Sequence, residues 1–465
     1  METDRRSIPE PALPLWARIV DGLALTLLLA GISIMVFGGG RASTPLGRIS
    51  FTSWQRPIVI GTALLFVRHW LHANPSLLRR LLSTLTLTSS AESRAVWPAF
   101  LSTRIGILLV GFFSIALLGY APNMPAFRVY GNDLLDLPAR WDAGWYLGIA
   151  EKGYQWDADH PDQMQNIAFF PAYPMAMRYG SLLVGRQRLI AGFLISLIAF
   201  FFALKYVFRL ARESIGGDGA ATAVALLAAY PFAFYYNAAY TEALFLLAIV
   251  ATCYHFQRDE LAPAAAWGLL AGLTRPNGCL LSVVLALMVL RDYRSIDTRT
   301  FVRRIAVAAM PGIGLLIFSA YIYGLTGNPL QWADNHAAYG RVYRSIFGLI
   351  DDRIQYIRVN GLYNYVTVLS VDLINVIPLL FAIGCIWPVY QRFGAPYAAM
   401  ILLNILLPLQ MGGVLSMGRL TSVMFPIFLW LGAAIAPQYR SGWLLSFGML
   451  QALLAAAFFT WRPLY

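Results

Sequence analysis

The sequence predicts an all-α, polytopic membrane protein of about thirteen transmembrane helices. Hydrophobic residues make up 58% of its 465 positions and charged residues only 12%, whereas soluble domains carry about 25% charged residues. Apolar stretches of the length that crosses a bilayer recur from one end of the chain to the other. The net charge of +12 comes mainly from arginines in the short segments between these stretches. That placement indicates membrane topology rather than nucleic-acid binding.

The candidate spans divide the chain into three parts. We expect an N-terminal two-span extension (1–98), a transmembrane catalytic core (99–436) and a C-terminal span with its tail (437–465). The expected spans are 19–37, 57–72, 101–119, 188–206, 219–237, 241–257, 262–273, 278–290, 305–323, 364–390, 396–411, 420–436 and 443–459. Two of them, 262–273 and 278–290, are short for a bilayer core of ~30 Å. They flank the segment 275–278, which reads Arg-Pro-Asn-Gly, so a helix broken at a polar tip is expected there.

The apolar stretch 168–184 decides the orientation of the core. Pro171 and Pro174 interrupt it and Arg178 lies inside it, so we expect it to enter the membrane without crossing. The arginine-bearing segments 73–100, 205–218 and 291–304 then share the cytoplasmic side. Segment 120–167 has three basic and seven acidic residues and becomes a long first outer loop of the core. Segment 324–362, also rich in Trp, Tyr and Leu, is the other long non-spanning region.

Four polar clusters fall on the outer side in this topology. They are RWDAGWY (140–146), YTE (240–242), TRPN (274–277) and SMGR (416–419). Segments so far apart in sequence are expected to meet if they form one site. The residues expected to bind substrate are Arg140, Trp141, Tyr146, Tyr240, Glu242, Arg275, Asn277 and Arg419.

Asp142 is the candidate catalytic base. Trp141, Trp145 and Ile149 recur at helical spacing around it, which predicts a surface amphipathic helix over 141–154 with an aromatic face at the membrane boundary. An enzyme that joins a lipid-borne donor to an outer acceptor needs its base at that boundary. The pattern alone equally allows Asp142 to be only the N-cap of the helix. Glu151, Asp157 and Asp159 are the carboxylates to consider if Asp142 is not the base.

Glu242, Arg275 and Arg419 lie at the tips of spans. Ionisable residues at membrane depth usually line an interior path or pair with each other. A guanidinium can hold a phosphate through two parallel hydrogen bonds, so Arg275 and Arg419 are candidates for a phosphate ligand. A structural Glu–Arg pair, or snorkelling to the interface, is the alternative.

Metal chemistry has weak support in the sequence. Asp157, Asp159 and His160 have ligand-type side chains at short spacing, but a solvated acidic loop explains them more simply. Cys253, Cys279 and Cys385 lie in apolar stretches without CxxC spacing, so neither a zinc site nor a disulfide framework is expected. We expect no required cofactor.

Taken in order, these clusters resemble the GT-C glycosyltransferases and, within them, the PIG-V mannosyltransferase family. The matching stretches are RWDAGWYLGIAEKGY (140–154), AFFPAYPMAMR (168–178), YPFAFYYNAAYTEALF (230–245), GLLAGLTRPNG (268–278) and SMGRLTSVMFP (416–426). The resemblance covers about residues 100–430, and the two-span extension has no counterpart in it. It implies a multi-span fold, a polyprenyl- or dolichyl-phosphate-sugar donor, and an acidic catalytic residue early in the first outer loop, which corresponds to Asp142.

The expected function is therefore sugar transfer, with inversion, from a lipid-linked donor to a glycan, glycolipid or protein acceptor on the outer or lumenal side. The membrane would be a bacterial inner membrane or the endoplasmic reticulum, and the sugar would be mannose, although related folds use other sugars. A transporter or flippase of lipid-linked sugars is the alternative, because broken helices and intramembrane arginines also suit that class. A transporter predicts two halves related by a repeat, which the sequence lacks. A structural membrane subunit would leave the polar clusters unexplained.

Overall fold

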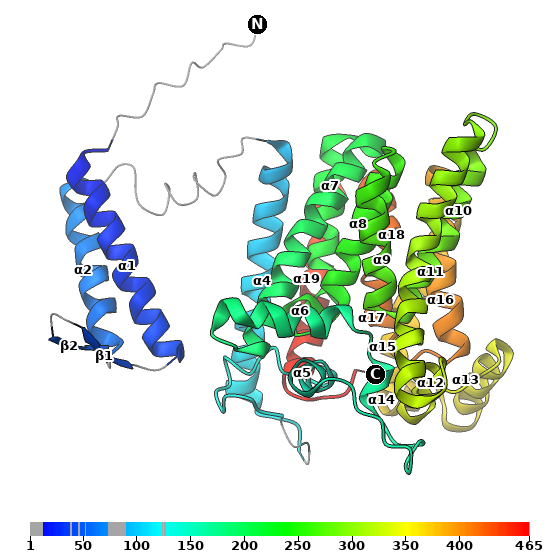
Figure 1. Ribbon diagram of the computed structural model, residues 1–465, viewed down its shortest axis with the longest axis horizontal. Helices are drawn as coiled ribbons and strands as arrows, with labels where there is room; N and C mark the ends of the chain where they lie inside the picture. The colour runs from blue at the N-terminus through cyan, green and yellow to red at the C-terminus, as the bar shows by residue number, and fades with distance from the viewer. Residues whose placement is uncertain are drawn as a thin grey trace, which may run out of the picture. The chain divides into compact units, whose positions relative to one another are not determined.

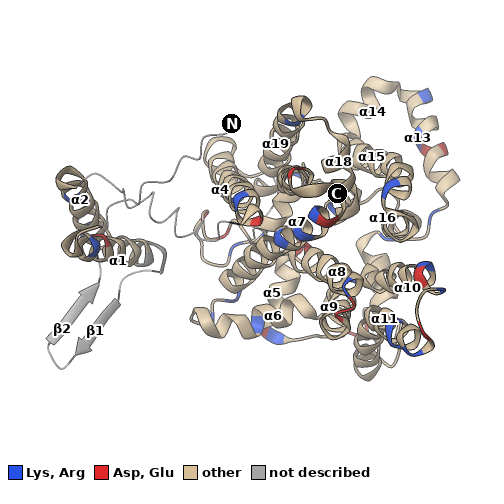
Figure 2. Cartoon of the chain, turned by 90° about the horizontal axis from the view of Figure 1, so that it is seen from above, with Lys and Arg blue, Asp and Glu red and all other residues tan. Residues whose placement is uncertain are grey.

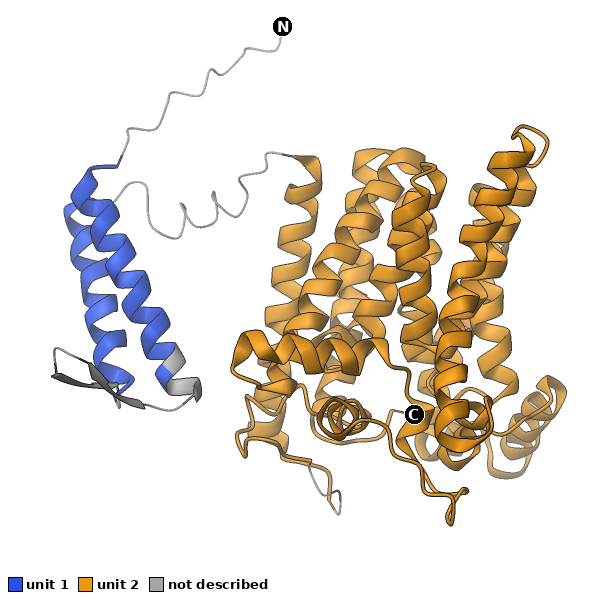
Figure 3. Ribbon diagram, in the orientation of Figure 1, with its two compact units in different colours: residues 1–89 blue, residues 90–465 orange. Residues whose placement is uncertain are grey.

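The computed structural model describes residues 13–37, 40–44, 47–51, 53–72, 90–122, 124 and 127–464. The described residues form a helical membrane protein, as the composition predicts (Figure 1). Contacts divide the chain into two compact units, residues 1–89 and 90–465 (Figure 3). The C-terminal span 437–465 therefore belongs to the same unit as the core.

The smaller unit is a pair of antiparallel helices, α1 (Leu15–Phe37) and α2 (Gln55–Leu71). They correspond to the expected spans 19–37 and 57–72, and the expected cytoplasmic segment 73–89 lies outside the described residues. A hairpin of β1 (Gly40–Thr44) and β2 (Gly47–Phe51) connects them and is the one departure from helix among the described elements. Arg68 Nε and Asp21 Oδ1 lie 3.0 Å apart with both side chains almost fully buried. This pair neutralises two charges between apolar helices, where an unpaired charge would be costly.

The larger unit contains the remaining helices. The long or upright ones are α4 (Ala91–Leu118), α7 (Arg188–Ala229), α8 (Glu242–Gln257), α9 (Leu261–Thr274), α10 (Leu281–Asp292), α11 (Thr298–Thr326), α15 (Ser370–Phe393), α16 (Ala395–Gln410), α18 (Phe425–Ala434) and α19 (Pro437–Phe459). The shorter ones are α5 (Ala143–Lys152), α6 (Ala172–Gly180), α12 (Gln331–Asp334), α13 (Ile346–Asn360), α14 (Leu362–Val368) and α17 (Met417–Thr421). Figure 1 shows α5 and α6 lying across the upright helices. Single 3₁₀ turns are η1 (Asn166–Ala168), η2 (Ser181–Val184), η3 (Ala233–Asn237), η4 (Pro276–Leu280) and η5 (Asn335–Tyr339).

Fewer helices are long enough to cross a membrane than the sequence predicts. Among the described residues six qualify by length and composition, and four more apolar helices have 10–17 residues. Prolines account for part of the difference, because they end helices and restrict the residue before them. The expected span 219–237 stops as a helix at Ala229, before Pro231, and residues 230–241 continue without α-helix. The expected spans 278–290 and 420–436 are likewise preceded or divided by short turns.

The connection expected over 205–218 is also much shorter in the structure. Helix α7 continues to a single non-helical residue, Gly216, with φ 77° and ψ 172°. A positive φ of this kind suits glycine, which has no Cβ to clash with the backbone. The chain reverses its direction at Gly216. Before it, Arg209 pairs with Glu92 near the start of α4, and after it the carbonyl oxygen of Ala228 accepts from Arg104, further along α4.

Segment 168–184 does not cross the bundle. It forms η1, the nine-residue α6 and η2, and nine helical residues extend only ~14 Å. Arg188 Nη1, at the start of α7, then lies 3.8 Å from Glu151 Oε1 near the end of α5, so the chain has returned to the end from which it entered. Figure 1 places the α10–α11 connection at the opposite end from α5. The end that faces the cytoplasm stays a prediction.

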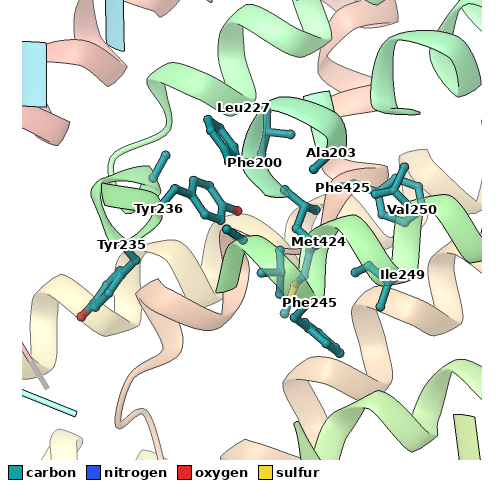
Figure 4. Packing of buried hydrophobic residues seen from close by; sticks show 14 of the residues in the cluster. Phe200, Ala203, Leu227, Tyr235, Tyr236, Phe245, Ile249, Val250, Met424 and Phe425 are labelled. Carbon is teal, nitrogen blue, oxygen red and sulfur yellow. The ribbon is translucent and has the colours of Figure 1, made fainter. Parts of the chain in front are cut away.

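Apolar residues fill the centre of the larger unit, and charged residues lie mainly at helix ends and in connections (Figure 2). Figure 4 shows Phe200 beside Tyr236, whose rings stack with centroids 4.1 Å apart. This packing joins α7 to segment 230–241, which contains the 3₁₀ turn η3 but no α-helix. The segment is thereby held by the core although it lacks α-helical hydrogen bonds.

A buried arginine supports the same segment. Arg104, on α4, donates to the carbonyl oxygens of Ala228 and Ala233 at 3.0 and 2.6 Å and to Oδ1 of Asn237 at 2.5 Å. The carbonyl groups at the end of a helix have no intrahelical partner, so a buried donor is needed there. Arg104 thus stabilises the chain that leads directly to Tyr240 and Glu242.

Candidate active site

Side chains from all four polar clusters meet in the larger unit. Arg419 Nη1 donates to Asp142 Oδ2 at 2.6 Å, and Arg419 Nε donates to Glu242 Oε1. Arg275 Nη1 donates to the same Glu242 oxygen at 2.5 Å. Asp142 precedes α5, Glu242 begins α8, Arg275 joins α9 to η4, and Arg419 lies in α17. The site is therefore built where helices start or break, because such positions leave side chains free to project beyond the helix ends.

The two carboxylates differ in burial. Asp142 is 25% exposed and faces a cavity, whereas Glu242 is fully buried behind it. Two guanidiniums compensate the charge of Glu242, which a buried carboxylate requires. Glu242 therefore organises the arginines, and Asp142 is the carboxylate that a ligand can reach.

Asp142 does not act as the cap of α5. It occupies the position before the helix, but its side chain accepts no hydrogen bond from the first turn. Its backbone N–H donates to the hydroxyl of Tyr240 at 3.0 Å, and its carboxylate is turned toward Arg419. The N-cap interpretation is wrong, since tertiary contacts orient the carboxylate. Helix α5 lies within the expected 141–154, and its position at a membrane surface stays a prediction.

The cavity beside Asp142 has a volume of about 490 Å³, which is within the range of ligand sites. Its polar part contains Asp142, Asn277 and the three arginines 275, 341 and 419. Its apolar part is formed by Phe170, Leu280, Leu315, Trp332, Leu407, Pro408 and Met411. One cavity thus combines a charged lining with an apolar lining.

Segment 327–345 contributes residues that the sequence analysis missed. Trp332, His336, Tyr339 and Arg341 all line the cavity. The length and aromatic content of 324–362 marked the region, but no local pattern distinguished these residues. Burial, followed by the charge of Arg341, lowers the pKa of His336 to about 4, so its imidazole is neutral at pH 7. Burial, followed by the charge of Arg419, lowers the pKa of Arg341 to about 10, which leaves it cationic.

The expected substrate-binding residues divide into three groups. Tyr146, Arg275, Asn277 and Arg419 line the cavity. Tyr240 and Glu242 lie behind it, with the Tyr240 ring 4.7 Å from the guanidinium of Arg419. Burial raises the pKa of Tyr146 to about 12, so this hydroxyl stays protonated.

Arg140 and Trp141 do not line the cavity. Arg140 is buried and donates to the carbonyl oxygens of Phe459 and Asp136 at 2.9 and 2.5 Å. Trp141 packs on Trp461, with ring centroids 5.1 Å apart. Both residues join the segment before α5 to the end of α19. Their role is structural, because the burial of Arg140 among carbonyl oxygens leaves its guanidinium no access to a ligand.

The Asp157–Asp159 motif closes a turn away from the cavity. Asp157 Oδ1 accepts the N–H of Asp159 at 3.0 Å, and Asp157 Oδ2 lies 2.9 Å from His160 Nδ1 on the exposed surface. Within the described ranges, no group of three His, Cys, Asp or Glu residues could hold a metal ion. The three cysteines are free, and Cys279 lines the cavity.

Known structures give distant likenesses. ArnT from Cupriavidus metallidurans, solved with undecaprenyl phosphate, has 15% identity and a TM-score of 0.42, covering 76% of this chain and 64% of that one. An Archaeoglobus fulgidus oligosaccharyltransferase in complex with zinc and sulfate has 13% identity and a TM-score of 0.38, covering 76% and 53%. The same enzyme tethered to an acceptor peptide has 11% identity and a TM-score of 0.37, covering 78% and 55%. No curated protein matches the chain.

The family comparison is more specific. The model of the mannosyltransferase family PIG-V matches residues 122–326. That range contains Asp142, Glu242 and Arg275, whereas Arg341 and Arg419 follow it. It is also shorter than the 100–430 expected from the motifs. The predicted resemblance is nevertheless confirmed, because residues 122–326 of this chain match the PIG-V mannosyltransferase family.

Proposed function

We propose that the protein is a glycosyltransferase that transfers a sugar, with mannose as the first candidate, from a polyprenyl- or dolichyl-phosphate carrier to an acceptor hydroxyl, with inversion. The observation that carries the proposal is the position of Asp142. Its carboxylate reaches a cavity that is lined by three arginines and by apolar side chains. A lipid-phosphate sugar has an anionic head and an apolar tail, which match these two kinds of side chain.

The reaction would be a direct displacement. The acceptor oxygen forms a bond to the anomeric carbon while the bond from that carbon to the phosphate oxygen breaks on the opposite face. The hydroxyl proton passes to Asp142, since a hydroxyl is a poor nucleophile until a base takes its proton. The electron pair of the broken bond stays on the phosphate, whose growing charge the arginines offset.

Arg419 would position Asp142 for this step. It occupies Oδ2 of the carboxylate, and no hydrogen-bond donor from the described residues reaches Oδ1. One oxygen is therefore anchored while the other remains available as the base. In this proposal Arg419 and Arg275 hold the two carboxylates in place.

The apolar side chains that line the cavity would contact the first part of the donor's isoprenoid chain. Undecaprenyl phosphate, the ligand named for the ArnT structure, is a lipid of this chemical class. The acceptor is a glycan, glycolipid or protein, and the site opens to the periplasm or the lumen of the endoplasmic reticulum. A transporter or flippase would need a passage between the two membrane sides but would not need a carboxylate poised beside a phosphate site.

The decisive experiment supplies the purified protein with polyprenyl-phosphate sugars radiolabelled in mannose, glucose or arabinose. We expect transfer to a glycan acceptor, or slow hydrolysis without one, from at least one of these donors. The same sugars linked to nucleotides serve as the control and should release no label. If no lipid donor loses its sugar, while liposomes containing the protein move the intact lipid between leaflets, the protein is a flippase instead.

A further inference from the structure

Helix α13 has an apolar side that is exposed in the structure. Phe347, Ile350 and Ile354 recur at steps of three and four residues, so they project from one side of the helix. They are exposed by 85%, 52% and 42% and are called the apolar stripe below. On α14, Leu362 and Val366 are exposed as well. Neighbouring apolar side chains that stay exposed mark a surface that binds protein or membrane.

The rest of the circumference of α13 divides into a packed side and a polar side. Leu349 is buried, and Arg353 Nε donates to Asp372 Oδ2 of α15 at 2.9 Å, so these two residues face the bundle. Asp352 and Gln355 are exposed on the polar side. A helix that met only protein and water would have polar residues wherever protein does not pack on it. The three different sides of α13 are typical of a helix at a membrane surface.

Helix α13 runs across the end of the upright helices. The N–H of Arg344, just before α13, donates to the carbonyl oxygen of Gln410, the last residue of α16, at 2.8 Å. Arg353 bonds to Asp372 in the first turn of α15. Because α15 and α16 are joined at the single residue Gly394, the start of α15 and the end of α16 lie at the same end of the unit. The two contacts are ~13 Å apart along α13, so the helix extends along that end.

The apolar stripe lies where a membrane-spanning surface ends. Helix α15 is long and apolar enough to cross a membrane. Its exposed side chains Ile377, Leu380 and Ile383 follow soon after Asp372. Figure 2 shows α13 and α14 at the outer edge of the larger unit, next to α15. The stripe therefore continues the lipid-facing surface of α15 at the level at which that span begins.

We propose that α13 is an interfacial helix, whose apolar stripe lies between the headgroups and acyl chains of one leaflet while its polar side faces water. The partner is a lipid surface, which is indicated by the continuity with α15 and by the polar residues on the remaining exposed side. Helices of this kind bury their apolar side ~5–10 Å into the boundary. The inference goes beyond the proposed sugar transfer and does not depend on it.

The side chain of Asp372 fixes the rotation of α13. Arg353 Nε and Nη2 donate to its two oxygens at 2.9 and 2.5 Å, and the hydroxyl of Tyr365, on α14, donates to Oδ2 at 2.6 Å. A bidentate pair of this kind sets orientation as well as distance. Both short helices are thus tied to the first turn of α15, and the apolar stripe cannot turn away from lipid without breaking these bonds.

The interfacial helix also borders the candidate active site. Leu349 packs on Gly413, where a Cβ would lie 3.0 Å from Leu349 Cδ2. Met411 and Leu415, on either side of Gly413, line the cavity. An α13 held in the membrane boundary would place this border of the cavity at the level of the headgroups. In the proposed function, an amphiphilic substrate could then reach the cavity while its tail stays in the leaflet.

The test places a spin label at one position at a time in a cysteine-free background, with the full chain in lipid nanodiscs. Phe347→Cys and Ile354→Cys carry the label on the apolar stripe, and Asp352→Cys and Gln355→Cys are the matched controls on the polar side. Relaxation by molecular oxygen, which concentrates among acyl chains, is compared with relaxation by a water-soluble nickel chelate. Labels at 347 and 354 should favour oxygen and report a depth of ~5–10 Å, whereas labels at 352 and 355 should favour the nickel chelate.

Three results would overturn the inference. Equal access of the nickel chelate to all four labels would place α13 in water. Exclusion of both reagents from 347 and 354 would show that another protein surface, such as a second copy of the chain, covers the stripe. A depth near the bilayer centre, ~15 Å, would make α13 part of a span. None of these readings uses transfer activity, so failure of the proposed function would leave them unchanged.

A charge substitution gives an independent measurement. Ile354→Asp should lower the melting temperature in nanodiscs, because a carboxylate loses hydration at the acyl boundary. Gln355→Asp, one residue along on the polar side, should leave it unchanged. If α13 lies in water, both substitutions concern exposed positions and should have equally small effects. Equal melting temperatures of the two variants would therefore contradict the lipid contact.

Discussion

Arg419 and Asp142, 277 positions apart in the sequence, are joined by a 2.6 Å hydrogen bond between Nη1 and Oδ2. The same guanidinium continues to Glu242, so one arginine orients the exposed carboxylate and compensates the buried one. This arrangement explains why an acidic residue at the head of a short helix is not used as its cap. The proposed catalytic role of Asp142 can therefore be tested separately from its role in folding, because an Asn side chain keeps the same shape.

Asp142→Asn should lower turnover by ~10²–10⁴-fold with donor binding largely kept, because it removes the base without removing the phosphate ligands. Turnover and donor affinity of the purified variant would be measured together. Asp159→Asn, on the exposed turn away from the cavity, is the control and should behave as wild type. Near-normal turnover of folded Asp142→Asn would move the search for the base to Glu151, Asp157 or Asp159.

Gly314→Ala should destabilise the protein, whereas Gly324→Ala on the same helix should not. A Cβ at 314 would lie 2.5 Å from the carbonyl oxygen of Leu269, so α9 and α11 would have to separate. Overpacking of this kind costs ~1–3 kcal/mol, and α9 ends at Arg275, so activity should fall too. At Gly324 the added methyl group meets nothing within 4 Å. Thermal unfolding in detergent would compare the two, and equal melting temperatures would contradict the close packing of α9 on α11.

Acidification should destabilise the wild type more than His336→Gln. The pKa of His336 is about 4 in the folded protein and 6.5 ordinarily, so the unfolded chain binds the proton first as pH falls. The neutral imidazole therefore contributes full stability above about pH 6.5, and that contribution is lost progressively between 6.5 and 4. Melting temperatures at pH 7.5 and pH 5 would be compared for both proteins. An equal decrease in the two would show that His336 does not titrate in this way.

In a cysteine-free background, Asp162→Cys should react with an impermeant reagent added from outside, and Ser295→Cys only after permeabilisation. The two positions lie in the connections 153–165 and 293–297, at opposite ends of the larger unit (Figure 1). The arginines of 291–304 predict that the end of the unit carrying position 295 faces the cytoplasm. Labelling of position 295 from outside would invert the topology and place the active site in the cytoplasm.

Much about this protein follows from local sequence. Apolar length and loop arginines are properties of short segments, so they predicted a helical membrane protein and located most of its helices within a few residues. The broken helix at Pro276 and the short segment 168–184 were visible for the same reason, since proline acts on its immediate neighbours. The motifs around Asp142 and Arg275 predicted the resemblance that the family comparison confirmed over residues 122–326.

Other features depended on contacts between distant segments. Arg140 and Arg419 look alike in sequence, each beside an aromatic or small residue at the end of a polar cluster, yet one is enclosed by carbonyl oxygens and the other faces a cavity. Arg104 from α4 holds segment 230–241 in its unwound form, and Arg341 lines the cavity without an ion pair among the described residues. In each case the role of the arginine depends on the charges and hydrogen-bond partners that separate helices bring to it. A local sequence pattern contains only some of these groups, so only the tertiary structure could decide the role.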